Sequence, residues 1–289
     1  MKGRVLTLGH SPDPDDAFMH YALAAEQIPL QGYRFVHVLR DIQTLNEMAQ
    51  RGELDITAIS IHAYPYVADL YALLPNGASM GDGYGPRVIA REPLDREALR
   101  QKTIAVPGTM TSAFLALQLW LDRPAEALSY IVVPFDQIFD VVQRGEAEAG
   151  LVIHEGQLTW EEAGFVLCAD LGQWWQQTHD GLPLPLGANV IHKRIPPEER
   201  RQIARLLRQS IEYALANREE ALAYALQFGR GLNRALGDRF IEMYVNHWTL
   251  DYGPQGREAI RRFLTEAYDH GLLPRLPEIE FVTYPEDSF

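Results

Sequence analysis

A histidine and a glutamate follow a short apolar run in the middle of the chain. Residues 149–153, AGLVI, have the length and residue types of a buried strand, and His154 and Glu155 come directly after them. In open α/β sheets, ligands bind at the carboxyl ends of the strands. An imidazole titrates near neutral pH, so His154 is suited to proton transfer. A hydrogen-bonding or surface histidine is the commoner outcome of this pattern, and both interpretations stay open at this point.

Other chemistries lack their sequence motifs. Neither a P-loop nor an H-E-x-x-H motif occurs, and His62, His179 and His192 are not at metal-ligand spacings. The first strand–helix turn carries SPDPDD, where a dinucleotide-binding fold would carry G-x-G-x-x-G. We therefore expect no metal and no cofactor. The single cysteine, Cys168, excludes an intrachain disulfide, and its setting FVLCAD favours a buried small hydrophobe over a nucleophile.

Composition limits the partners of the protein. The 289 residues are 47% hydrophobic and 22% charged, as in ordinary globular proteins, and suffice for one large or two modest domains. A net charge of −13 argues against nucleic acid as a partner. The sequence has no apolar run of membrane-spanning length and no apolar leader segment. We expect a cytoplasmic protein that acts on a small molecule and has no membrane partner.

The elements that would position these residues begin with a strand at residues 5–8. The turn SPDPDD follows, and apolar side chains at i, i+3, i+4 and i+7 predict a helix from Asp15 through residue 27. The aspartates of this turn are interpreted as helix caps, because three carboxylates would repel an anion. Further along, strands are predicted at 33–39, 54–61 and 87–90, a helix at 41–51, and a helical or extended segment at 67–74.

The same pattern restarts at residue 103. Strands predicted at 103–106, 131–133 and 149–153 alternate with helices at 113–121 and 136–144. The tetrapeptide QRGE at residues 50–53 recurs at 143–146, each time after an amphipathic helix and before a strand. Two similar α/β units in tandem predict two lobes that face each other across a cleft, with His154 on the wall of the second lobe.

The remaining chain predicts a return to the first lobe. A connector is expected at 181–187, a strand at 188–192, and helices at 198–216, from Asn217 with Glu220 as a capping box, at 238–248 and at 254–270. Lobe one is thus predicted as residues 1–90 plus 187–289, and lobe two as 91–186. The tail 272–289 either wraps a lobe or packs on a partner, and the oligomeric state stays open.

Three tryptophans, Trp160, Trp174 and Trp175, lie between the second lobe's last predicted strand and the connector. Their pattern favours core or interface packing, with the lining of a cleft for an aromatic ligand as the alternative.

Several motifs together resemble one enzyme family. In chain order they are SPDPDDAFMHYAL, RDIQTLNEMAQRGELDITAISIHAY, GDGYGPRVIAR, AVPGTMTSAFLAL, GEAEAGLVIHEGQLTW and DLGQWW…GLPLPLGAN. From Val5 to about Trp248, this series resembles the 1,4-dihydroxy-6-naphthoate synthases of the futalosine route to menaquinone. One departure concerns the first turn, where the family often carries Asn before its Asp. This chain has Asp15-Asp16, so Asp15 is assigned no role.

The resemblance implies an α/β fold like that of periplasmic solute-binding proteins, with two lobes and an interlobe cleft. It implies a carbon–carbon lyase that cleaves cyclic dehypoxanthine futalosine to 1,4-dihydroxy-6-naphthoate and a sugar-derived fragment. In the family, the histidine of the GLxIHE block is the proposed base, and His154 matches it. The substrate contacts carried over by position are Ala58, Ile59, Ser60, Ser112 and Ala113, together with Asp16.

General chemistry agrees with these implied roles. Ser112 and Ala113 lie at a predicted helix start, where N–H groups suit a carboxylate. Neutral His154 would remove a proton to start the cleavage, with Ser60 holding a polar edge of the substrate. Two alternatives remain. One is a solute-binding protein for a small carboxylate, and the other is the chorismate dehydratase of the same pathway, whose motifs differ from SPDPDD and GLVIHEG.

Overall fold

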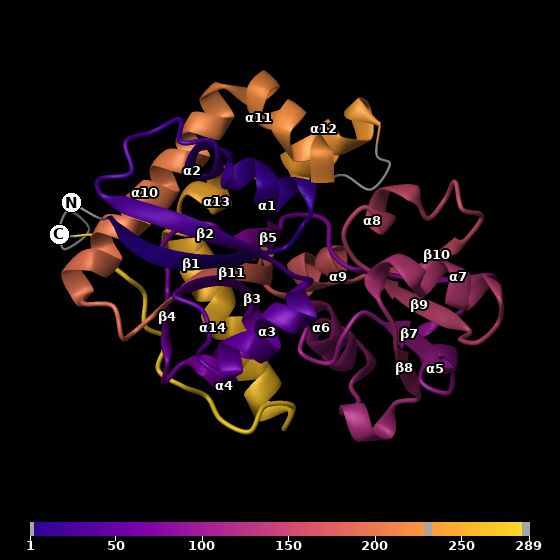
Figure 1. The fold of residues 1–289 in the computed structure, drawn as a ribbon. Coiled ribbons are helices and arrows are strands. Elements are labelled where there is room, and N and C mark those ends of the chain that lie inside the picture. Colours follow the sequence, from indigo (N-terminus) through magenta and orange to yellow (C-terminus); the bar gives the residue numbers. More distant parts are fainter. Residues whose placement is uncertain (1–2, 229–232, 285–289) are drawn as a thin grey trace. The chain divides into compact units, whose positions relative to one another are not determined.

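The computed structural model describes residues 3–228 and 233–284, which divide into two compact units (Figure 1). Unit 1 comprises Met1–Ser79, Gly187–Pro254 and Pro277–Phe289. Unit 2 comprises Met80–Leu186 and Gln255–Leu276. The chain therefore passes between the units four times.

These units differ from the expected lobes in two places. Strand β6 (Arg87–Ala90), expected at the end of lobe one, belongs to unit 2, because it pairs antiparallel with β9 (Ala149–Val152). Most of helix α14 (Gly253–Asp269), also expected in lobe one, belongs to unit 2 as well. There the ring of Phe263 meets that of Trp175 edge to face, with centroids 5.3 Å apart. Helix periodicity does not indicate which side chains such a helix contacts.

A mixed sheet forms the centre of unit 1. Its strands follow the order β2-β1-β3-β11-β4, and β5 pairs with β11 off this path (Figure 1). β1 is parallel to both β2 and β3, whereas β11 is antiparallel to β3 and β4. The strands are β1 (Arg4–His10), β2 (Tyr33–Leu39), β3 (Ile56–Ser60), β4 (Tyr71–Leu73), β5 (Ser79–Gly81) and β11 (Leu184–His192), and the unit boundaries at 79/80 and 186/187 fall within β5 and β11.

Helices pack around this sheet for reasons visible in their sequences. Helix α3 is amphipathic, and the Asp41 carboxylate accepts the Thr44 N–H at its start. Helix α10 begins on Pro197 and buries one apolar face. The helices of unit 1 are α1 (Pro14–Met19), α2 (Tyr21–Ala24), α3 (Ile42–Gln50), α4 (Tyr64–Val67), α10 (Pro197–Ala216), α11 (Arg218–Ala225), α12 (Arg234–Tyr244) and α13 (His247–Leu250).

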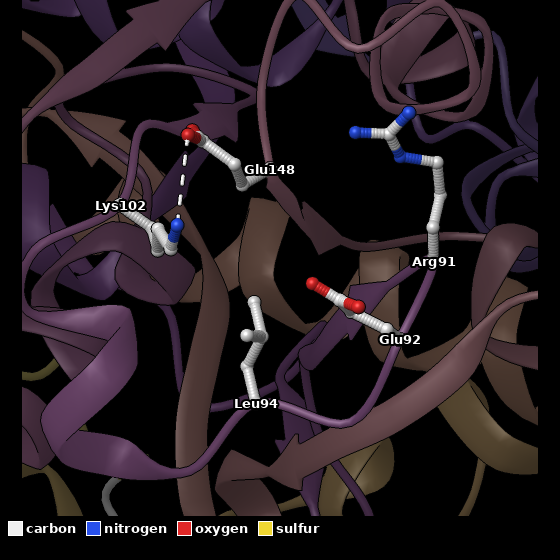
Figure 2. Close-up of a pocket in the computed structure, with 5 residues that line it drawn as sticks. All are labelled: Arg91, Glu92, Leu94, Lys102 and Glu148. Atoms are coloured by element: carbon white, nitrogen blue, oxygen red, sulfur yellow. Dashed lines mark ion pairs between the residues drawn. The ribbon is translucent and has the colours of Figure 1, made fainter.

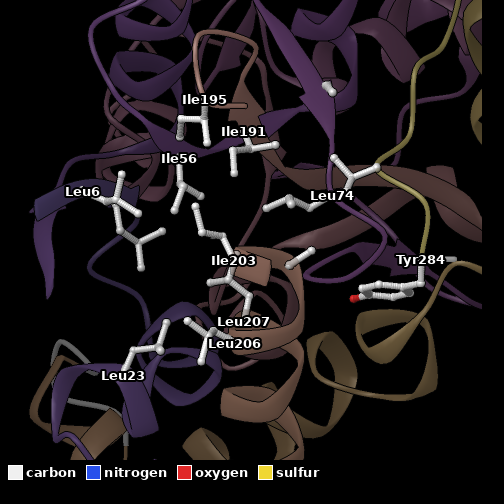
Figure 3. Packing of buried hydrophobic residues seen from close by; sticks show 14 residues of the cluster. Leu6, Leu23, Ile56, Leu74, Ile191, Ile195, Ile203, Leu206, Leu207 and Tyr284 are labelled. Atoms are coloured by element: carbon white, nitrogen blue, oxygen red, sulfur yellow. The ribbon is translucent and has the colours of Figure 1, made fainter. Parts of the chain in front are cut away.

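The main core of unit 1 joins segments far apart in the sequence. Strand residues Leu6, Ile56 and Ile191 pack against α10 residues such as Ile203 and Leu207 (Figure 3). The chain end completes this core. Val282 and Tyr284 are buried in the same cluster, the Leu73 N–H donates to the Glu280 carbonyl at 2.8 Å, and Phe281 forms a parallel bridge with Leu73. The described part of the tail beyond residue 276 therefore packs on unit 1, which is one of the two expected outcomes.

Unit 2 repeats the sheet-and-helix construction. Its sheet order is β10-β6-β9-β7-β8, with β7 parallel to β8 and β9. The strands are β6 (Arg87–Ala90), β7 (Ile104–Val106), β8 (Tyr130–Val132), β9 (Ala149–Val152) and β10 (Val166–Asp170). The helices are α5 (Arg96–Leu99), α6 (Ser112–Leu121), α7 (Ile138–Gln143), α8 (Gly156–Thr159), α9 (Leu171–Thr178) and α14. Four short 3₁₀ turns occur in the described chain, at Ile61–Ala63, Ala125–Ala127, Phe135–Gln137 and Leu226–Phe228.

Several predicted boundaries were wrong. The helix expected from Asp15 to residue 27 is interrupted at His20, whose backbone leaves the helical region while its ring packs on that of His10. The connector expected at 181–187 is already strand from Leu184. The expected helix 238–248 is two helices, α12 and α13. Asn217 does not cap α11 with its side chain, because its amide donates to the Tyr213 carbonyl.

The three tryptophans all belong to unit 2, where Trp160 and Trp175 have different environments and the Trp174 ring meets those of Trp175 and His179 edge to face. Trp175 is fully buried, its ring stacks on that of His179 with centroids 3.5 Å apart, and it packs on Phe263. The prediction of core packing is therefore confirmed for Trp175. Trp160 lies beneath the guanidinium of Arg87, whose Cζ is 5.9 Å from the ring centroid. No helix within the described ranges is long and apolar enough to cross a membrane.

Candidate active site

His154 lies in a strained turn after strand β9. The strand ends at Val152 and helix α8 begins at Gly156, so His154 and Glu155 form the turn between them. His154 has a φ of 54°, in the left-handed region that non-glycine residues rarely adopt. Such a conformation costs on the order of 1–3 kcal/mol and persists where surrounding contacts hold it, often at functional sites.

A backbone hydrogen bond and an aromatic contact are among the interactions that hold this turn. The Gln157 N–H donates to the His154 carbonyl at 3.1 Å, which closes the turn into α8. The half-buried imidazole lies against the ring of Phe135, with centroids 4.5 Å apart and planes tilted by 54°. The side chain is thus placed by both its backbone and an aromatic neighbour.

Ser112 and Ala113 form the first two positions of helix α6, which follows strand β7. The Thr111 hydroxyl caps the helix by accepting the Phe114 N–H at 3.1 Å. The Ser112 hydroxyl donates to the Leu186 carbonyl at 2.6 Å, so its proton is committed within unit 2. The N–H groups of a helix's first turn have no acceptor inside the helix, and the helix dipole makes this end attractive to anions. A carboxylate would therefore meet backbone donors, such as that of Ala113, rather than the serine proton.

These two segments share one edge of the unit 2 sheet. β7 and β9 are neighbouring parallel strands, with Ile104 opposite Ala149 and Ala105 opposite Gly150. The α6 start and the His154 turn both come after the carboxyl ends of these strands. Ligands bind at this edge in open α/β sheets. The sheet topology thus groups a helix start suited to an anion with a titratable side chain.

Ser60 ends strand β3 of unit 1 and is held by Asn46. The Asn46 amide donates to the Ser60 hydroxyl at 3.1 Å, and the Ser60 N–H donates to the Asn46 side-chain oxygen at 2.8 Å. Both residues are buried. Sequence analysis missed Asn46, although a polar side chain among the apolar ones of an amphipathic helix was a usable signal. Such a residue is buried only when its hydrogen bonds are satisfied.

The other expected contacts of unit 1 are buried side chains. Ala58 packs in an apolar cluster with Leu45 and Leu54, and Ile59 is fully buried. Asp16 is also buried, and its carboxylate accepts the Ser11 N–H at 2.7 Å. The Asp16 side chain thus stabilises the SPDPDD turn. His154, Ser112 and Ala113 belong to unit 2, and Asp16, Ala58, Ile59 and Ser60 belong to unit 1.

The remaining nucleophile and metal candidates are accounted for by their surroundings. Cys168 is half-buried rather than buried as expected, because β10 is an edge strand, and burial raises the pKa of its thiol. Within the described residues, no group of three or more His, Cys, Asp or Glu side chains is arranged to hold a metal ion. The pentapeptide GASMG at residues 77–81 matches the G-x-S-x-G pattern of a nucleophile elbow. Such an elbow places its serine between a strand and a helix, whereas Ser79 begins strand β5 and strand β6 follows.

A surface pocket in unit 2 is not this site. It has a volume of about 300 Å³ and is lined by Arg91, Glu92, Leu94, Lys102 and Glu148, as Figure 2 shows. Lys102 and Glu148 come just before strands β7 and β9, and their charged groups are 4.0 Å apart. The pocket therefore lies at the amino-terminal edge of these strands, away from the edge that carries His154.

Comparison with solved structures defines the class of fold. An alkanesulfonate-binding protein from Xanthomonas axonopodis pv. citri matches with a TM-score of 0.71 at 15% identity, covering 95% of this chain and 96% of that one. A protein from Archaeoglobus fulgidus matches with a TM-score of 0.88 at 39% identity, covering 93% and 98%. The protein therefore has a two-lobed α/β fold of the periplasmic-binding-protein type, as the family resemblance implied.

Comparison with known sequences defines the family. The family model described as menaquinone biosynthesis matches residues 6–269. A 1,4-dihydroxy-6-naphthoate synthase from Thermus thermophilus is 39% identical over 281 residues, covering 96% of this chain and 99% of that one. The synthase of that name from Streptomyces coelicolor is 38% identical over 279 residues, covering 96% and 97%. The chain belongs to the menaquinone biosynthesis family, and the resemblance stated from the motifs is confirmed.

Proposed function

We propose that this protein is a carbon–carbon lyase that converts cyclic dehypoxanthine futalosine to 1,4-dihydroxy-6-naphthoate without a cofactor. The observation that supports it most is His154, held in a left-handed turn at the carboxyl end of β9, in a chain 39% identical to a synthase of that product. Strained non-glycine residues concentrate at functional sites. We place the reaction in the cytoplasm, which fractionation of the source cells would test.

In the proposed site, the α6 start binds the substrate carboxylate. Backbone N–H groups of the first helical turn and the positive end of the helix dipole both favour an anion. The bond from the Ser112 hydroxyl to the Leu186 carbonyl fixes the backbone that presents these groups. From unit 1, we propose that Asp16, Ala58, Ile59 and Ser60 supply the remaining substrate contacts. Because Ala58 and Ile59 are buried apolar residues, they would contribute shape or backbone groups rather than charge.

His154 acts as the general base in this proposal. Its imidazole takes a proton from the substrate, a carbon–carbon bond breaks, and the electron pair of that bond goes toward aromatisation of the ring that becomes part of the naphthoate. The sugar-derived fragment leaves. A positioned general base supplies typically about 10²–10⁴-fold in rate. Orientation of the bound substrate must supply much of the rest.

Incubation of the purified protein with cyclic dehypoxanthine futalosine tests the proposal directly. We expect 1,4-dihydroxy-6-naphthoate in the wild-type reaction, identified by mass and ultraviolet absorbance, and its formation at least about 10²-fold more slowly with His154→Ala. The same assay with chorismate tests the dehydratase alternative. Absence of product together with tight binding of an unrelated carboxylate or sulfonate would instead favour a solute-binding protein, a function that the fold alone also supports.

A further inference from the structure

We propose that Arg87 is a positioning residue that fixes the turn carrying His154 and thereby increases turnover without touching the substrate. This inference rests on the proposed function, since it assigns His154 the role of base. Arg87 ends the motif GDGYGPR, for which neither the proposed chemistry nor the substrate contacts have a use. All of the residues that carry the argument belong to unit 2.

The location of Arg87 brings it next to the turn. It is the first residue of β6 and lies directly opposite Val152, the last residue of β9, in the antiparallel register. His154 follows two residues later. The side chain of Arg87 is only 20% exposed, so its guanidinium reaches into the unit rather than into solvent.

The guanidinium makes three contacts, one within helix α8, one with the residue that follows α8, and one with the end of strand β10. One Nη donates to the Gln157 carbonyl, and the Nε donates to the Asp170 carboxylate at 3.2 Å. Its Cζ lies 5.9 Å from the centroid of the Trp160 ring. Trp160 directly follows α8, so the cation contacts both a residue of this helix and the residue after it.

Gln157 connects this contact to the histidine. Its N–H donates to the His154 carbonyl at 3.1 Å, while its own carbonyl accepts from Arg87. Helix α8 has only four residues, too few to be stable by itself. Contacts from outside the helix therefore help to maintain the left-handed conformation of His154, and Arg87 provides a charged contact of this kind.

Asp170 keeps the guanidinium in one orientation. Its side chain is 4% exposed, and while one carboxylate oxygen accepts from Arg87, the other accepts the N–H groups of Gly172 and Gln173 at the start of α9. An arginine paired in this way has little freedom to swing away from α8, and lysine cannot reproduce its planar set of donors. The α9 start, the guanidinium and the His154 turn are thus connected through hydrogen bonds.

Steady-state kinetics of Arg87→Lys test this role. Lysine keeps a charge beside Asp170, so the fold should survive, but it cannot hold the Asp170 carboxylate and the Gln157 carbonyl with one planar group. We expect kcat to fall by about 10- to 100-fold, the range for residues that support a catalytic group, with KM within about twofold. Arg96→Lys is the matched control, because Arg96 also covers a tryptophan of unit 2, Trp120 at 6.0 Å, and should leave kcat unchanged.

Imidazole NMR signals supply a readout that needs no substrate. In protein labelled at histidine, the His154 signal, assigned by its loss in His154→Ala, should shift or broaden in Arg87→Lys and stay in place in Arg96→Lys. Unchanged kcat in Arg87→Lys, a loss expressed wholly in KM, or an unperturbed His154 signal would each overturn the positioning role. Full turnover by His154→Ala would instead refute the proposed base, whatever the NMR signal of Arg87→Lys shows.

Discussion

Replacement of His20 by phenylalanine should stabilise the protein, and most strongly in mild acid. His20 is 1% exposed, and both of its ring nitrogens are buried without a hydrogen-bond partner. Its ring lies among those of His10 and His37, with centroids 4.9 Å and 6.5 Å away. An unsatisfied buried polar group costs about 1–3 kcal/mol. The larger phenyl ring offsets part of that gain, so we expect about 1 kcal/mol of stabilisation at pH 7.5.

The pH dependence of this effect follows from burial. Burial lowers the pKa of His20 well below its usual value, with His10 and His37 adding to the shift, and burial lowers the pKa values of His10 and His37 to about 4. The unfolded chain therefore binds protons more tightly than the folded one between pH 6.5 and pH 4. The contribution of these three histidines to the free energy of unfolding is fully present above pH 6.5 and decreases as the pH falls below it. For His10 alone, the loss between pH 7 and pH 5 is about 2 kcal/mol.

Urea unfolding of wild type and His20→Phe at pH 7.5 and pH 5.5 measures both effects. The variant should have the higher midpoint at each pH and the smaller decrease between them. His270→Phe serves as the control, because His270 is exposed and should change neither quantity. A lower midpoint for His20→Phe at both pH values, with the same decrease as wild type, would refute the reasoning. The ring nitrogens of His20 would then have hydrogen-bond partners within the core.

Three further substitutions test the proposed site. His154→Ala should lower kcat by at least about 10²-fold while substrate affinity by calorimetry stays within a few fold; unchanged turnover would remove it as the base. Ser112→Ala removes the bond to Leu186 and should mainly raise the KM, and a loss confined to kcat would contradict the carboxylate assignment. Asn46→Ala removes two hydrogen bonds from the buried Ser60 and should lower the free energy of unfolding by about 1–3 kcal/mol. Urea unfolding measures this loss, with Ser60→Ala as the comparison variant.

Local pattern was sufficient for much of the secondary structure. The alternation of residues 33–39 predicted strand β2 with its observed bounds, and the strand predicted at 87–90 is β6, also with its observed bounds. Side chains alternate in a half-buried strand whatever it pairs with, so this signal is local. The motif series was also sufficient for the family, since it is carried by residue types in order. The α/β fold class followed from both.

Packing decided what local pattern does not encode. The break at His20, the assignment of α14 to unit 2 and the tail on β4 all depend on contacts between residues far apart in the chain. Periodicity reports which face of an element is apolar, not which partner covers it. For α14 the partner includes Trp175 and His179, whose Nε2 lies 2.6 Å from the Glu266 carboxylate.

At the candidate site, too, local sequence pattern predicted some features and tertiary packing decided others. The sequence by itself determined that His154 follows a strand and that Ser112 lies at a helix start, because both follow from short apolar runs and turn residues. Only the tertiary structure decided that His154 is left-handed, that Ser112 donates to Leu186, and that Arg87 reaches the Gln157 carbonyl. Backbone strain and hydrogen bonds across strands depend on three-dimensional neighbours, which residue spacing along the chain does not specify.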